Sequence, residues 1–191
     1  MSVPIISRIE YTDGRDSQVR MHLSFPETLE IENGTPLGEV YRHWLTCNVD
    51  DPGMFFESRR YLSKEAQSTI STIVDVSADE PLEYLFREHT LRTSFHFYAG
   101  LRIGELRSRM AQKALTDEYL YVKGKQEPVI HEVHEWRTTE NNTRVDRHYV
   151  KINLPLFDQT GAVSYIVVAS RFLAPDIVPL SCALEQSLLV R

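Results

Sequence analysis

Apolar and polar residues alternate most regularly in the last third of the chain. Three segments, residues 128–138, 144–155 and 162–172, show this alternation and predict three long β-strands. Short polar turns at 140–142 and 158–161 separate them. A parallel return would need a crossover of about a dozen residues or more, so these strands are expected to be antiparallel neighbours.

The two faces of the middle strand differ in character. One face carries His148, Val150, Ile152, Leu154 and Leu156. The other face carries Arg147, Tyr149, Lys151 and Asn153. This pattern predicts a sheet with one buried face and one wetter face. The strand over 162–172 is apolar on both faces, so we expect it to be central, or covered by a helix or another chain.

The N-terminal part of the chain predicts a hairpin followed by helices. Residues 5–11 and 19–25 flank the turn signal Asp13-Gly14, which is typical of a hairpin. A helix is expected to begin at Thr35-Pro36, with the threonine as N-cap and the proline as first helical residue. A second helix is expected over about 52–70.

The middle of the chain changes period twice. Short β-like runs at 73–76 and 84–87 surround a polar stretch and predict a second hairpin. Residues 93–123 are expected to be mostly helical, because apolar residues recur there at helical spacing.

Composition and charge narrow the class of protein. The chain has 191 residues with 42% hydrophobic and 25% charged content, which fits one ordinary globular domain with extensions. Its net charge is −6 and its Lys and Arg residues form no basic block, which argues against nucleic-acid binding. No apolar run approaches the roughly 20 residues that span a bilayer. Without a leader pattern, the cytoplasm is the expected location.

Searches for catalytic and metal-binding motifs identify no candidate. The segment His131-Glu132-Val133-His134-Glu135 resembles a zinc signature, but its histidines are three residues apart on an expected strand. An odd separation on a strand places the two rings on opposite faces, so we predict no metal site. No nucleophile motif or phosphate loop is present, and Cys47 and Cys182 form no CxxC pair. We therefore expect no catalytic residues.

One group of side chains could line an apolar ligand pocket. Phe95, Phe97 and Tyr98 form an aromatic cluster just before a predicted helix. Met110, Trp136 and His148 complete the set of predicted ligand-binding residues. Plain core packing is the alternative interpretation of the aromatic cluster, and a hydrogen-bonded core histidine is the alternative for His148.

Several short motifs between residues 37 and 172 resemble PAS domains. The segments that carry this resemblance are Ile73-Val74-Asp75-Val76, Tyr84-Leu85-Phe86-Arg87, Gln126-Glu127-Pro128-Val129 and the run from Tyr149 to Asp158, followed by Gly161 and Ile166-Val167-Val168-Ala169. The predicted order of elements, a hairpin, a helical middle and three long strands, points the same way. The chain is similar to small bacterial PAS-like proteins that stand alone.

The resemblance implies an α+β fold. It would consist of a PAS-like five-stranded antiparallel sheet with helices packed on one face, plus an N-terminal arm or hairpin. The expected divisions are an extension over 1–34, a PAS-like domain over 35–173 and a C-terminal tail over 174–191. A small-molecule pocket between sheet and helices, and dimerisation through the sheet, are also implied. PAS domains hold heme, flavin, small acids or nothing, and no cofactor-specific motif selects among these.

These observations favour a sensory or regulatory module over an enzyme. Such a module would bind a small ligand, a protein partner or both, form a homodimer through the sheet, and pass its signal to a separate output protein. One alternative is a small cone-like α+β enzyme that uses a pocket histidine or carboxylate as its base. Another is an interaction protein with a filled core and no ligand pocket.

Overall fold

We analysed a computed structural model of the chain, which describes residues 4–14, 16–24, 33–47, 50–89, 98–138, 144–173 and 177–178. The helices are α2 (Pro36–Thr46), α3 (Pro52–Ser58), α4 (Lys64–Thr69) and α5 (Arg109–Lys125), and short 3-10 turns lie at Arg59–Tyr61, Pro81–Glu83 and Ile103–Glu105. The strands are β1 (Ile5–Asp13), β2 (Asp16–Leu23), β3 (Ile70–Asp75), β4 (Leu85–His89), β5 (Val129–Thr138), β6 (Arg144–Phe157), β7 (Val163–Phe172) and β8 (Ile177–Val178).

The strands form a single antiparallel sheet in the order β1-β2-β5-β6-β7-β3-β4, and β8 pairs with one end of β6. Both predicted hairpins and the three long C-terminal strands are present. The expectation of five strands is wrong, because the N-terminal hairpin does not stand apart as an arm. Its strand β2 pairs with β5 and extends the sheet.

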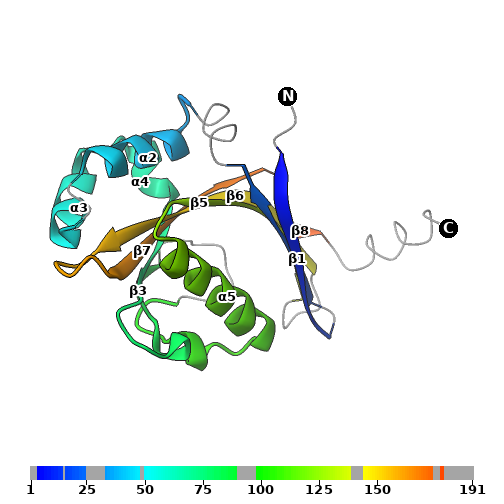
Figure 1. Cartoon of the computed structure of the whole chain (residues 1–191). Coiled ribbons are helices and arrows are strands. Elements are labelled where there is room, and N and C mark those ends of the chain that lie inside the picture. Colours follow the sequence, from blue (N-terminus) through cyan, green and yellow to red (C-terminus); the bar gives the residue numbers. More distant parts are fainter. Residues whose placement is uncertain are drawn as a thin grey trace.

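Helices cover both faces of the sheet, not one face as expected (Figure 1). Leu37 and Val40 of α2 pack with Leu154 of β6 in one apolar cluster, which also includes Ala66 of α4. On the opposite face, Tyr119 and Val122 of α5 pack with neighbouring strands in a second cluster. The sheet is therefore the middle of three layers.

Local signals explain where the N-terminal helices begin and end. The Thr35 hydroxyl accepts a hydrogen bond from the Gly38 amide, which caps α2 as the sequence predicts. The prediction of a single helix over 52–70 is wrong, because the helix is interrupted there. Leu62 has an extended backbone, and the Ser63 hydroxyl caps a new helix by accepting from the Ala66 amide.

The polar side chains of β6 face the interior, contrary to the expectation of a wetter face. Lys151 and Asn153 are 5% and 0% exposed. Helix α5 crosses this face of the sheet and places the carboxylate of Glu118 against both side chains. The polar row of β6 therefore lines a polar interior.

Strand β7 lies between β6 and β3, which confirms its predicted central place. Its Val167 belongs to the cluster that α2 and α4 cover, whereas Ile166 and Val168 belong to the cluster beneath α5. Helices of the same chain thus account for both of its apolar faces. No helix in the described ranges is long and apolar enough to cross a membrane.

Replacing Leu154 by alanine should test the packing of α2 and α4 on the sheet. Leu154 is 0% exposed, so we expect L154A to lower the free energy of unfolding by about 2–5 kcal/mol in chemical denaturation. The matched control is L120A, because Leu120 on α5 is 44% exposed and its loss should cost within about 0.5 kcal/mol. Equal effects in the two variants would contradict the three-layer arrangement.

Candidate functional site

A cavity of about 100 Å³ lies between α5 and the sheet. Its walls come from β2 to β7, from α5 and from Tyr98. The lining is strongly polar and includes the charged residues Glu135, Arg137, Arg147 and Lys151. Hydroxyl and amide groups add further polarity, notably those of Gln18, Ser71, Thr72, Tyr149 and Ser170. This composition differs from the apolar pocket that the aromatic cluster predicts.

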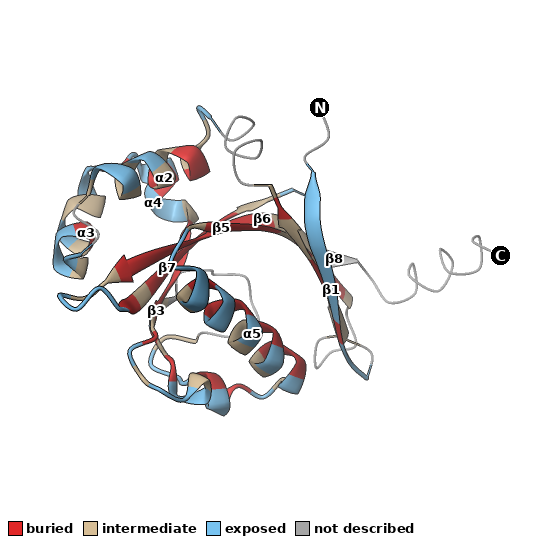
Figure 2. Ribbon diagram, in the orientation of Figure 1, coloured by how far each residue is buried: buried red, intermediate tan, exposed pale blue. Residues whose placement is uncertain are grey.

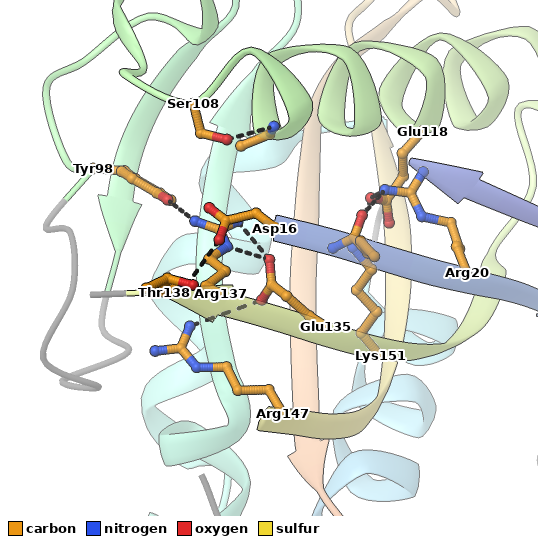
Figure 3. A network of polar contacts seen from close by, with 12 residues as sticks. Asp16, Arg20, Tyr98, Ser108, Glu118, Glu135, Arg137, Thr138, Arg147 and Lys151 are labelled. Carbon is orange, nitrogen blue, oxygen red and sulfur yellow. Dashed lines mark hydrogen bonds and ion pairs between the residues drawn. The ribbon is translucent and has the colours of Figure 1, made fainter. Parts of the chain in front are cut away.

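One charged cluster lies at the end of the cavity near Tyr98 (Figure 3). Glu135 and Arg137 are two residues apart on β5, so they share a face, and Arg147 lies opposite Glu135 in the β5–β6 ladder. The Arg137 guanidinium donates to the Glu135 carboxylate and, at 3.4 Å, to the Tyr98 hydroxyl. Arg147 Nη1 lies 4.0 Å from Glu135 Oε2. One carboxylate thus lies between two guanidinium groups.

A second charged cluster surrounds Glu118 of α5. Its Oε2 lies 2.9 Å from Arg20 Nη2 and 2.6 Å from Lys151 Nζ. Its Oε1 accepts a hydrogen bond from Asn153 Nδ2 at 2.8 Å and lies 3.3 Å from His131 Nδ1. Burial acts to raise the pKa of Glu118, but the two cations outweigh it and hold the pKa well below its usual value. Glu118 is therefore a buried carboxylate anion that joins α5 to β2, β5 and β6.

His131 is a neutral member of this second cluster. Burial is the largest cause that lowers its pKa, to about 4, and the charges of Arg20 and Lys151 act in the same direction. At neutral pH its imidazole therefore carries no charge.

Counted together, the two clusters hold more positive than negative charge. The cations are Arg20, Lys151, Arg137 and Arg147, with side-chain exposures of 3%, 6%, 18% and 13%. The carboxylates are Glu118 and Glu135, at 0% and 4%. Among these six side chains the cations outnumber the carboxylates, and burying a cation is costly unless an anion or hydrogen bonds balance it.

The structure separates the residues that the sequence predicts as ligand-binding. Tyr98 lines the cavity. Met110 is buried beside it, in a small cluster with Tyr11 and Ala114. Trp136 and His148 lie on the other face of the sheet, because residues of their parity point toward α2 and α4. Phe95 and Phe97 fall outside the described residues.

The sheet face that holds His148 carries a separate polar group. His148 Nε2 contacts Glu132 Oε1 at 2.5 Å, and His134 Nε2 contacts Asp146 Oδ1 at 2.8 Å. The two imidazoles stack with ring centroids 4.9 Å apart. As predicted, His131 and His134 point to opposite faces of β5. In the described part of the chain, no three metal-ligating side chains are grouped closely enough to hold a metal ion.

Sequence reasoning missed the charged residues of the cavity, although two signals mark them. Glu118 follows Ala111 and Ala114 at helical spacing and precedes Val122, so a charged residue interrupts the buried stripe of α5. Such an interruption indicates a buried partner of opposite charge. The second signal is the row of polar residues on one face of β6. This face is interior because α5 covers it.

Comparisons of this chain with protein-family models, with curated proteins and with solved structures find no match.

Replacing Glu118 by glutamine should strongly destabilise the fold. The variant leaves Arg20 and Lys151 buried without their anion, so we expect E118Q to lower the free energy of unfolding by about 3–5 kcal/mol. The control is E83Q, since Glu83 pairs with Arg102 at an exposed site where such a pair contributes at most about 1 kcal/mol. A small effect of E118Q in chemical denaturation would show that the Glu118 cluster is not a structural centre.

The pKa of His131 predicts that the free energy of unfolding decreases as the pH is lowered. Its folded pKa of about 4 lies below the unfolded value of 6.5, so the unfolded chain binds more protons between these values. From pH 7 to pH 5 this group alone should reduce the free energy of unfolding by about 2 kcal/mol. Denaturation series at both pH values should show a smaller decrease for H131Q than for the wild type. Identical decreases in wild type and H131Q would contradict the assignment.

Proposed function

We propose that the protein is a PAS-like sensory or regulatory module whose cavity binds a small anionic ligand. The observation that carries this proposal is the excess of buried positive charge beside the cavity. An anion that contacts Arg137 and Arg147 would balance that charge. Guanidinium groups are well suited to the task, because they donate paired hydrogen bonds to carboxylates.

The arrangement of elements supports the PAS-like part of the proposal. Five neighbouring strands, β5, β6, β7, β3 and β4, form one part of the sheet. Along the chain they run as the hairpin of β3 and β4, helix α5, and three long strands. A cavity between the sheet and α5 also fits the resemblance, whereas helices on both faces and the added hairpin go beyond it.

Cavity size and polarity limit the class of ligand. A buried cavity of about 150 Å³ in another protein accommodates benzene, so about 100 Å³ fits a ligand of roughly four or five non-hydrogen atoms. Burial raises the pKa of Tyr149, which lines the same cavity, so its phenol stays protonated as a hydrogen-bond donor. The site therefore favours a short carboxylate over an aromatic or apolar molecule.

The N-terminal hairpin is the element best placed to respond to the ligand. Gln18 of β2 lines the cavity, and Arg20 of the same strand pairs with Glu118 on α5. A ligand that favours one position of β2 over another would shift the populations of the two states by its difference in affinity. The module would pass this change to a separate output protein, and it would act as a homodimer formed through the sheet.

Calorimetric titration with acetate and glycolate tests the proposal, and acetamide serves as the neutral control for acetate. We expect at least one of these anions to bind and acetamide not to bind. R137Q and R147Q should each weaken anion binding by about tenfold or more, since each removes a charge-assisted hydrogen bond. R87Q should bind as the wild type does, because Arg87 pairs with Asp75 outside the cavity.

Three results would contradict anion binding. These are no heat with any of the anions, equal binding of acetate and acetamide, or unchanged affinity in both arginine variants. Native mass spectrometry of the freshly purified protein adds a check for a ligand that is already bound.

A small enzyme is the second candidate function, and Glu135 is the observation that favours it. His148, which the sequence predicts as a pocket residue, is on the other face of the sheet, but the Glu135 carboxylate lines the cavity between two guanidinium groups. Following a bound anion by NMR over time distinguishes the two functions, because a sensor leaves its ligand chemically unchanged. The cavity also supports a ligand-binding module over an interaction protein with a filled core.

A further inference from the structure

Strand β1 is an exposed edge of the sheet. It ends the order of strands, so no described strand pairs with its outer side. Its residues are exposed over most of its length (Figure 2). Three of them are large and apolar, since Ile5, Ile6 and Ile9 are 54%, 62% and 46% exposed. An edge of this kind presents unpaired backbone N–H and C=O groups that can pair with another strand.

The opposite edge of the sheet differs, because other backbone covers it. The Phe86 amide of β4 donates to the Leu101 carbonyl at 3.0 Å, and the Gly100 amide donates to the Phe86 carbonyl at 2.7 Å. Among the described strands, β1 is therefore the edge that remains open to an added strand.

Two charged residues of β1 restrict what can pair with it. Arg8 and Glu10 point to the same face, and their side chains are 60% and 52% exposed. That face is opposite the one on which Tyr11 packs against Met110 and Ala114 of α5. Charges on an edge strand usually prevent pairing between copies. Within one chain Arg8 Nη2 lies 3.5 Å from Glu10 Oε2, and a cation and an anion two positions apart can also complement those of a second copy across a two-fold axis.

We propose that β1 pairs with the β1 strand of a second copy of this chain. The two strands run antiparallel, and the two-fold axis passes between the two copies of Ile9. A two-fold axis normal to the sheet keeps each side chain on its own face. One residue of β1 must therefore lie opposite the same residue of the second copy. Centring on Ile9 places Arg8 opposite Glu10 of the partner subunit, and this contact occurs twice.

The neighbouring registers are disfavoured by charge. Centring on Arg8 or on Glu10 would place that residue opposite its own copy, and like charges directly opposite each other destabilise a strand pair. Centring on Ile9 instead brings the two copies of this exposed side chain together on the face nearer α5. The irregular pairing between Ile5 and Ser7 lies away from this centre.

The proposed pair would join two sheets into one continuous sheet. This inference specifies the homodimer of the proposed function, but it does not depend on a ligand in the cavity. Strand pairing alone buries less surface than a standard protein interface, so the dimer should dissociate on dilution.

Sedimentation equilibrium with charge-exchanged variants tests the register. The wild type should show a concentration-dependent dimer, and R8E and E10R alone should each raise its dissociation constant by about tenfold or more. An equimolar mixture of R8E and E10R should form a heterodimer, because every opposed pair in it is again complementary. The double variant R8E/E10R should also regain the wild-type dissociation constant.

Each other outcome contradicts a defined part of the inference. A wild type that stays monomeric at the highest soluble concentration excludes the dimer. A dimer unaffected by R8E and E10R excludes pairing of β1 centred on Ile9 but keeps dimerisation through another register or another surface of the sheet. Folded single variants whose mixture stays monomeric exclude the register. None of these results bears on anion binding, which the titrations measure in the same wild-type protein.

Discussion

The contact of Glu118 with Arg20 and Lys151 closes the interior between α5 and the sheet, and the positions of three elements, α5, β2 and β6, depend on it. A carboxylate with no exposed surface cannot exchange its partners for water, so both cations must stay close to it. The cation of Arg20 comes from the N-terminal hairpin, and that of Lys151 from the centre of the sheet. One buried charge therefore fixes how the hairpin, the helix and the central strands are placed relative to one another.

The same polar interior determines what the cavity can recognise. Its volume is small, so a ligand gains little from apolar contact and must gain its affinity from polar groups. Arg137 and Arg147 lie on the adjacent, paired strands β5 and β6, and Glu135 lies between their guanidinium groups. Rigid strands hold charged groups with less variation than loops do, which favours selection among ligands that differ by single atoms.

Elements with a local signal could be predicted from the sequence, and elements decided by tertiary contacts could not. Thr35 and Pro36 fix the start of α2 by themselves, and the alternation of β6 is visible over its whole length. Whether the polar side of β6 faces solvent, by contrast, depends on whether a helix covers it. Lys151 has the sequence pattern of a surface residue, and only the opposing Glu118 makes its burial tolerable. The sequence predicts an apolar pocket, whereas the charged character of the observed cavity depends on the packing of α5 on the sheet.

The docking of the hairpin has a consequence for the order in which the chain can fold. Residues 5–23 are synthesised long before β5, yet β2 finds its sheet neighbour only there. A hydrogen bond from the Thr138 amide to the Asp16 side chain spans 122 positions of sequence. Contacts between such distant segments form late, because closing a long loop costs entropy before the contact is made. During synthesis residues 5–23 therefore lack their sheet neighbour, and any hairpin that they form has both of its edges available to other chains.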